Sequence, residues 1–142
     1  LCTDECPIVT CVTMMDILLV EPDIVLLKSY KSQLEIHGLT VFVATDAGSA
    51  IEQIDDNQPQ LVVLEMQLAG HSGVEFLHEF RSYEDWANIP VVVYSSVPEY
   101  VFGLDKAMWT KFGVSRYLNK SKTSLTDLAG IIKTEIERAN HR

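Results

Sequence analysis

With 142 residues, the chain is long enough for one domain with a continuous hydrophobic core and too short for two ordinary domains. Hydrophobic residues make up 47% of the chain and charged residues 22%, and no apolar run approaches the roughly eighteen residues that a membrane helix needs. The formal net charge of −9 and the scattering of the basic residues exclude the basic stripe that direct nucleic-acid binding requires.

The first fifteen residues differ in character from the rest of the chain. All three cysteines of the protein fall here, at Cys2, Cys6 and Cys11. An odd number of cysteines outside a core argues against a disulfide framework and favours a reducing cytoplasm. A metal site would need a fourth ligand, and no histidine lies near them in the sequence. We therefore predict a flexible tail over residues 1–15 and a folded domain over residues 16–142.

From residue 16 onward, short apolar runs alternate with longer segments of helical periodicity. The five runs predicted as strands are residues 16–20, 40–44, 61–65, 90–94 and 115–119. Three of these runs are almost continuously apolar, which is typical of parallel strands that are covered on both faces.

The segments between the strands carry apolar residues at helical spacing, on one side only. They are Ile24, Leu27, Tyr30 and Leu34, then Ala47, Ala50, Ile51 and Ile54, then Val74, Leu77 and Phe80. Pro22 is expected at the first position of the first helix, and Ser124 with Asp127 is expected to cap the last one. Strands and helices in this alternation predict an α/β fold with a doubly wound, five-stranded parallel sheet between two helical layers.

In such a fold, ligands bind beyond the carboxyl ends of the strands. The residues at these ends are Glu21, Glu65, Ser95 and Lys120. Two carboxylates, a hydroxyl and an ammonium at one edge of a sheet can bind a divalent cation and an oxyanion. We therefore predict that the functional site lies there.

At this point the sequence resembles the receiver domains of two-component response regulators, over roughly residues 16–138. The matching segments, in order, are "ILLVEPD", "PQLVVLEMQLAGHSGVEFL", "IPVVVYSS" and "GVSRYLNKS". The resemblance implies a flavodoxin-like fold with strand order 2-1-3-4-5 and a role in phosphorelay signal transduction. It also implies that Ser95, Tyr117 and Lys120 occupy the positions of the family's hydroxyl, switch aromatic and lysine.

Two positions that carry the family's chemistry depart from its pattern, and Ser121 also replaces the proline that usually follows the lysine. Glu65 replaces the aspartate that accepts the phosphoryl group, and Glu21 alone remains of an acidic pair because Pro22 occupies the other position. A glutamate places its carboxylate about 1.5 Å further out, the length of one C–C bond, and phosphoryl transfer loses on the order of a hundredfold for a displacement of about 1 Å. The candidate ligands for Mg²⁺ are Glu21, Glu65 and the backbone of Gln67. Because these are few for an octahedral site, we expect no cofactor, no metal and no enzymatic activity.

The longer side chain of Glu65 allows a different contact. We expect its carboxylate to reach the Lys120 ammonium directly and so to hold the domain in one signalling state without phosphate. Ser95 and Tyr117 would then be fixed in the rotamers that correspond to this signalling state, or they would have no switching role. In a partly exposed cleft this contact would stabilise the domain only modestly.

The segment 100–113 predicts a surface for protein partners. We expect its core side to consist of Val101, Leu104, Met108 and Phe112. A second stripe, formed by Phe102, Lys106 and Trp109, is then left near solvent and suggests an interface, with core packing as the alternative. Receivers use this helix, the fifth strand and the last helix to dimerise or to dock partners. The expected partners are a sensor kinase, a downstream signalling protein or a second copy.

The preferred hypothesis is a stand-alone, atypical receiver that acts as a phosphorylation-independent interaction module. The main alternative is a working, Mg²⁺-dependent phosphoacceptor at Glu65 or at a nearby acid such as Asp23. Glu65 as a plain polar strand end also stays open. A nucleotide-binding flavodoxin-like domain would need a phosphate-binding glycine loop, and the sequence has none.

Overall fold

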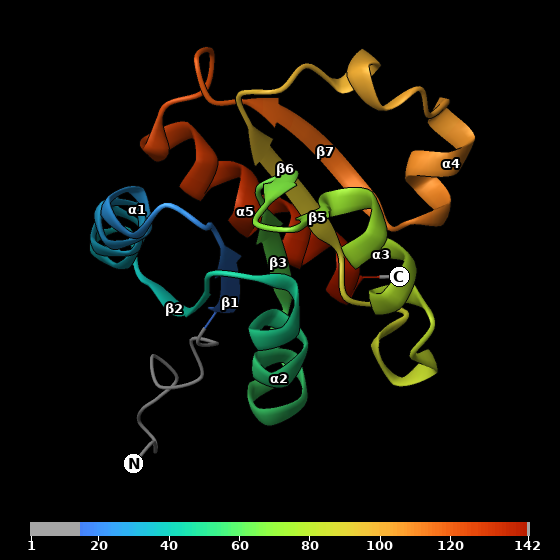
Figure 1. The fold of residues 1–142 in the computed structure, drawn as a ribbon. Coiled ribbons are helices and arrows are strands. Elements are labelled where there is room, and N and C mark those ends of the chain that lie inside the picture. The colour runs from blue at the N-terminus through green and yellow to red at the C-terminus, as the bar shows by residue number, and fades with distance from the viewer. Residues whose placement is uncertain (1–14, 142) are drawn as a thin grey trace.

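A five-stranded parallel sheet runs through the centre of the protein in the computed structural model, which describes residues 15–141 (Figure 1). Its strands are β1 (Met15–Val20), β2 (Leu39–Ala44), β3 (Leu61–Leu64), β6 (Val91–Ser95) and β7 (Val114–Asn119). Their order is β2-β1-β3-β6-β7, and every neighbouring pair is parallel. The predicted fold and strand order are therefore confirmed.

The first strand begins one residue earlier than predicted. Met15 is the first residue of β1, where it is in register with Leu39 of β2. The expected tail up to residue 14, with its three cysteines, lies outside the described residues.

Five α-helices and two 3₁₀ turns connect or follow these strands in the described part of the chain. They are α1 (Ile24–Ile36), α2 (Ala47–Asn57), α3 (Gly73–Arg81), η2 (Glu84–Trp86), η3 (Glu99–Phe102), α4 (Lys106–Lys111) and α5 (Leu125–Asn140). The last helix begins as predicted, since the Ser124 hydroxyl accepts a hydrogen bond from the Asp127 N–H.

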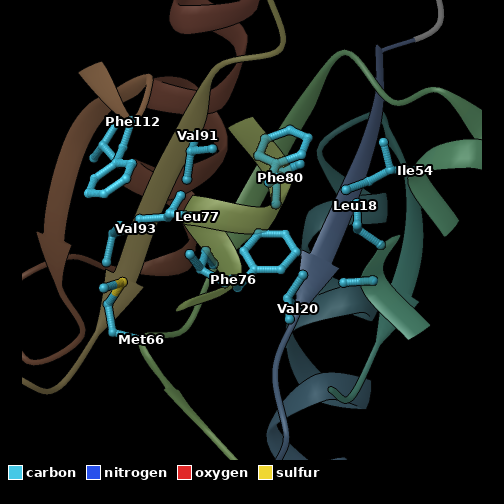
Figure 2. Packing of buried hydrophobic residues seen from close by; sticks show 14 of the residues in the cluster. Leu18, Val20, Ile54, Met66, Phe76, Leu77, Phe80, Val91, Val93 and Phe112 are labelled. Carbon is cyan, nitrogen blue, oxygen red and sulfur yellow. The ribbon is translucent and has the colours of Figure 1, made fainter. Parts of the chain in front are cut away.

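Each strand contributes alternate residues to two separate cores, one on each face of the sheet. On one face, α2, α3 and α4 cover residues such as Leu18 and Val93. On the other face, α1 and α5 cover residues such as Ile17 and Val63. Figure 2 shows the first core, in which Phe76, Leu77 and Phe80 of α3 pack beside β1 and β6. Burial on both faces explains why the strands are almost continuously apolar.

The start of α1 differs from the prediction. Asp23 is the N-cap, and its carboxylate accepts hydrogen bonds from the Val25 and Leu26 N–H groups. Pro22 therefore precedes the cap instead of occupying the first helical turn. Ile24 is half exposed although it shares the helical spacing of the buried Leu27.

The stripes predicted in segment 100–113 are only partly correct. Phe112 is buried and Leu104 packs against the core, as predicted. Trp109 is buried, in line with the core-packing alternative, whereas Val101 and Met108 are exposed. The cause is a break in the helix, because Gly103 adopts φ +66° and Asp105 caps a new helix at Lys106. The break changes the direction in which later side chains point, so one helical period cannot describe the whole segment.

A short antiparallel ladder follows β3. It pairs β4 (Gln67–Leu68) with β5 (His71–Ser72), and it was not predicted from the sequence. Gly73 then begins α3 in close contact with Met66, so that a Cβ atom there would overlap the Met66 side chain. Over the residues that the structure describes, every helix is too short or too polar to span a membrane.

Candidate functional site

The four side chains predicted from the strand ends meet at the carboxyl edge of the sheet. Ser95 is the last residue of β6, and the other three each follow a strand directly. The backbone of each of these three residues makes one further hydrogen bond within the sheet. The N–H groups of Glu21, Glu65 and Lys120 donate to the carbonyls of Ala44, Val20 and Ser95, each at 3.0 Å. The sheet itself therefore fixes where each functional side chain starts.

The Lys120 ammonium lies between two carboxylates. Its Nζ is 2.6 Å from Glu21 Oε1 and 2.7 Å from Glu65 Oε1. The predicted contact between Glu65 and Lys120 is present in the structure. The contact with Glu21 was not predicted, because sequence order alone does not tell how far a lysine side chain reaches across neighbouring strands. We call these three residues the carboxylate–lysine cluster; it carries two negative charges and one positive charge.

The remaining carboxylate oxygens of this cluster are also hydrogen bonded. Glu21 Oε2 accepts from the Asp23 N–H at 3.1 Å, and Glu65 Oε2 accepts from the Gln67 N–H at 3.0 Å. The Ser95 hydroxyl donates to the same Glu65 oxygen at 2.5 Å. Both oxygens of Glu65 therefore have partners of their own, and the side chain is held in one orientation.

The cluster is more buried than the sequence suggested. The side chains of Glu21, Glu65 and Lys120 are 4%, 6% and 14% exposed, so the expected partly exposed cleft is wrong. Part of the cover comes from Tyr30 and Tyr94, whose rings lie 5.4 and 6.0 Å from the Lys120 ammonium. Burial opposes the charge of Lys120, but hydrogen bonds to Glu21 and Glu65 and their negative charges outweigh it and raise the pKa of Lys120.

A chain of hydrogen bonds leads from the cluster to the aromatic side chains near α4. Ser95 Oγ accepts from the Val97 N–H at 3.1 Å, and the Val97 carbonyl accepts from the Tyr117 hydroxyl at 2.6 Å. The Tyr117 ring is 5.3 Å from the ring of Trp109. Glu65, Ser95, the loop after β6 and Tyr117 are thus linked by direct contacts. The role of Val97 was missed because backbone groups carry no signal in the sequence.

The donor set at this edge does not fit Mg²⁺ as it stands. Magnesium requires near-octahedral oxygen ligands at about 2.1 Å. Here both carboxylates face an ammonium, and Pro22 has no side-chain oxygen to offer. Within residues 15–141, no group of three or more His, Cys, Asp or Glu side chains is arranged to hold a metal ion.

The remaining predicted residues lie apart from the cluster. Asp23 is exposed and caps α1. Of the predicted interface, Lys106 is exposed, Phe102 is partly buried and Trp109 is buried. Sequence reasoning missed the exposed apolar residues of this region, which are Tyr100 at 81% exposure, Val101 at 56% and Met108 at 41%.

The burial of Tyr117 predicts a specific effect of alkaline pH. Burial, aided by the negative charges of Glu65 and Glu99, raises the pKa of Tyr117 from 10.0 to about 12. The folded protein therefore keeps this proton after the unfolded chain has lost it, and the stabilisation is complete below pH 10 and is lost as the pH rises toward 12. We expect the urea midpoint of the wild type to fall more steeply over this range than that of Tyr117→Phe. Equal slopes would contradict the burial of this hydroxyl.

Comparison with known proteins assigns this arrangement to a family. The family model described as "Response regulator receiver domain" matches residues 17–132. The KDP operon transcriptional regulatory protein KdpE of Escherichia coli is 28% identical over 107 residues, which are 75% of this chain and 45% of that protein. The response regulator MprA of Mycobacterium sp. (strain KMS) is 34% identical over 92 residues, which are 63% of this chain and 39% of that protein. The chain thus spans less than half the length of these two curated relatives.

Solved structures show the same fold. A CheY-like receiver domain from Methanospirillum hungatei JF-1 superimposes with a TM-score of 0.79 at 21% identity, covering 91% of this chain and 98% of the other. A receiver domain from Clostridium thermocellum gives a TM-score of 0.76 at 22% identity, covering 89% and 98%. With the family model matching most of the chain, this protein belongs to the response regulator receiver domain family.

Proposed function

We propose that this receiver domain is an atypical member of its family, a protein-interaction module whose state is set without phosphorylation. The observation that carries the proposal is the carboxylate–lysine cluster. Its lysine ammonium contacts both Glu21 and Glu65, and Ser95 is hydrogen bonded to Glu65. In this proposal, the Glu65 carboxylate replaces a phosphoryl group as the partner of Lys120 and Ser95.

The geometry of Glu65 disfavours a role as nucleophile. One carboxylate oxygen is engaged by Lys120, and the other by Ser95 and the Gln67 N–H. Attack on phosphorus would require an oxygen free of these contacts and in line with the leaving group. The donor set is also unsuited to Mg²⁺, which supplies the charge neutralisation of the ordinary reaction. We therefore propose that the domain needs no cofactor and has no enzymatic activity.

The alternative is a working phosphoacceptor at Glu65 or at Asp23. Asp23 is solvent exposed, but its carboxylate accepts two hydrogen bonds from the first turn of α1. Phosphorylation there would remove the N-cap, which typically contributes about 1 kcal/mol. The contacts of both acids thus favour the phosphorylation-independent hypothesis.

A mass measurement separates these two hypotheses. The wild type is incubated with Mg²⁺ and acetyl phosphate, and the intact mass is recorded. We expect no phosphoryl adduct on the wild type. The double variant Pro22→Asp/Glu65→Asp restores an acidic pair and a shorter acceptor, and we expect an adduct on it. A stoichiometric adduct on the wild type that Glu65→Gln or Asp23→Asn abolishes would establish the alternative.

Signal output is proposed to run through the surface near η3 and α4. The contacts from Glu65 through Ser95 and Val97 to Tyr117 end beside Trp109, whose buried indole N–H has no acceptor among the described residues. A buried donor without an acceptor costs about 1–3 kcal/mol. Repacking of this indole on binding would therefore favour a complex.

The expected partners follow from the character of this surface. Tyr100, Val101 and Met108 expose apolar area beside the cluster of aromatic rings. We propose that it docks a sensor kinase, a downstream signalling protein or a second copy, with β7 and α5 completing the interface. The net charge of −9 disfavours direct contact with nucleic acid or with an anionic membrane surface. The proposed location is the cytoplasm.

A further inference from the structure

A groove lies at the end of the domain opposite to the carboxylate–lysine cluster. It runs between the C-terminal half of α2 and the segment 82–89, which includes η2, and it has a volume of about 960 Å³. In Figure 1 both elements are at the lower end of the sheet, away from the arrowheads of β6 and β7. Trp86 is buried and Ile51 and Ile89 are partly buried, so the groove has an apolar floor. We call it the α2–η2 groove.

The rim of the α2–η2 groove is acidic. Glu52 and Asp55 of α2 face the same groove as Glu84 and Asp85 of η2, and all four are exposed. None of them forms an ion pair within residues 15–141, and the groove has no lysine, arginine or histidine in its lining. The rim therefore carries four negative charges that the domain itself leaves unpaired.

Arg81, the nearest cation in the sequence, does not neutralise this rim. Its guanidinium donates to the carbonyls of Phe112 at 2.7 Å and Trp86 at 2.8 Å, and also to the carbonyl of Ile89. The guanidinium N–H groups are therefore hydrogen bonded to backbone carbonyls of neighbouring segments and not to the rim acids. The four rim acids thus face solvent and are free to pair with a cation of a partner.

Intrahelical electrostatics does not account for the acids on α2. The last turn of this helix carries no basic residue, although helix C-termini favour positive charge. Asp55 lies near this end, so its charge opposes the helix dipole and is unfavourable for folding. An acid at a position that disfavours it, beside an apolar floor, supports a role of this surface in binding.

The aromatic residues of the groove suit a particular kind of cation. Tyr83 is 40% exposed, and its ring lies 4.4 Å from the ring of Trp86. An arginine guanidinium can stack on such an exposed ring while pairing with carboxylates, and its aliphatic part can cover the apolar floor.

We propose that the α2–η2 groove docks an arginine-containing basic segment of a partner protein, with an apolar side chain entering over Trp86. This surface is separate from the η3–α4 surface and from the strand ends. The proposal therefore holds whether or not Glu65 accepts a phosphoryl group.

The test uses the native fluorescence of Trp86. Trp109→Phe leaves Trp86 as the only tryptophan, keeps an aromatic ring and removes an indole N–H that has no acceptor among the described residues. This variant is titrated with a synthetic peptide of alternating arginine and leucine that contains no aromatic residue. We expect a saturable change in Trp86 emission.

Matched charge reversals locate the binding. In the Trp109→Phe background, Glu52→Lys/Asp55→Lys reverses two rim charges and also suits the α2 dipole, so the fold is expected to persist. Glu35→Lys/Glu79→Lys makes the same change in net charge at exposed sites on α1 and α3, outside the groove and outside the η3–α4 surface. We expect the first variant to weaken peptide binding by about tenfold or more and the second by less than about twofold.

Three results would overturn the proposal. Equal weakening by the two double variants would mean that only the net charge attracts the peptide. An unchanged Trp86 emission would place the peptide elsewhere. Dimerisation in light scattering that Glu52→Lys/Asp55→Lys abolishes would identify a second copy, not a basic segment, as the occupant.

Discussion

Replacing Lys120 with methionine is expected to lower the free energy of unfolding by about 3–5 kcal/mol at neutral pH, the cost of breaking a buried ion pair. The reason is that Glu21 and Glu65 remain as two buried carboxylates without their shared cation. The two carboxylates would also repel each other, because each approaches the same ammonium within 2.7 Å. Urea denaturation at pH 7 with a two-state fit measures the loss.

Two further variants identify the origin of this loss. Lys122 is exposed and forms no ion pair within the described part of the chain, so Lys122→Met should change the stability by less than about 0.5 kcal/mol. Adding Glu65→Gln to Lys120→Met removes one of the two uncompensated charges and should recover part of the stability. A loss below about 1 kcal/mol for Lys120→Met would mean that the cluster behaves like a surface salt bridge.

Replacing Arg81 with methionine should destabilise the domain by about 3 kcal/mol or more, since each hydrogen bond to a charged group contributes about 1.5–3 kcal/mol. The guanidinium donates to carbonyls of Trp86, Ile89 and Phe112, which belong to two different connections of the fold. It also lies 4.3 Å from the Phe80 ring. Burial lowers the pKa of Arg81 to about 10, so the side chain stays charged at neutral pH.

The planar shape of the guanidinium is essential to this role. Arg81→Lys should recover little of the stability, because one ammonium cannot reach carbonyls on separate segments. Arg116→Met, at an exposed position of β7, serves as the control. Thermal unfolding of the three variants gives the comparison. Full stability of Arg81→Lys would show that a positive charge alone is sufficient.

The fold could be predicted from the sequence because its elements have simple periods. Strands such as residues 61–64 are apolar on both faces, and helices such as α3 are apolar on one. The β4–β5 ladder was missed because two paired residues are too few for any period. The stripes in segment 100–113 were only partly right because Gly103 interrupts the helix. A pattern continued across this break buries Phe112 correctly but places Met108 in the core and Trp109 near solvent.

The site was predictable as a set of residues but not as a geometry. The rule that ligands bind at strand ends selected Glu21, Glu65, Ser95 and Lys120, which do meet in the structure. The contact between Glu21 and Lys120 depends on side-chain reach, which strand order does not specify. The burial of the cluster also depends on Tyr30 of α1, a residue that the sequence placed only on a helix face.

The acidic α2–η2 groove could not have been predicted from the sequence either. Its two walls come from residues 51–59 and 82–89, which are separated by β3 and α3 in the chain. Neither wall alone has a distinctive pattern, because pairs of acids such as Glu84 and Asp85 are common on exposed turns. Only their placement on two sides of one apolar floor distinguishes them.

Titration with beryllofluoride, a mimic of the phosphoryl group, in the presence of Mg²⁺ tests most directly whether the carboxylate–lysine cluster replaces phosphate. The measurement follows the backbone amide signals of Gln67, Val97 and Lys120 by ¹H–¹⁵N NMR in the wild type and in Pro22→Asp/Glu65→Asp. We expect the wild-type signals to stay in place and those of the double variant to shift. Saturable shifts of these three signals in the wild type would contradict it.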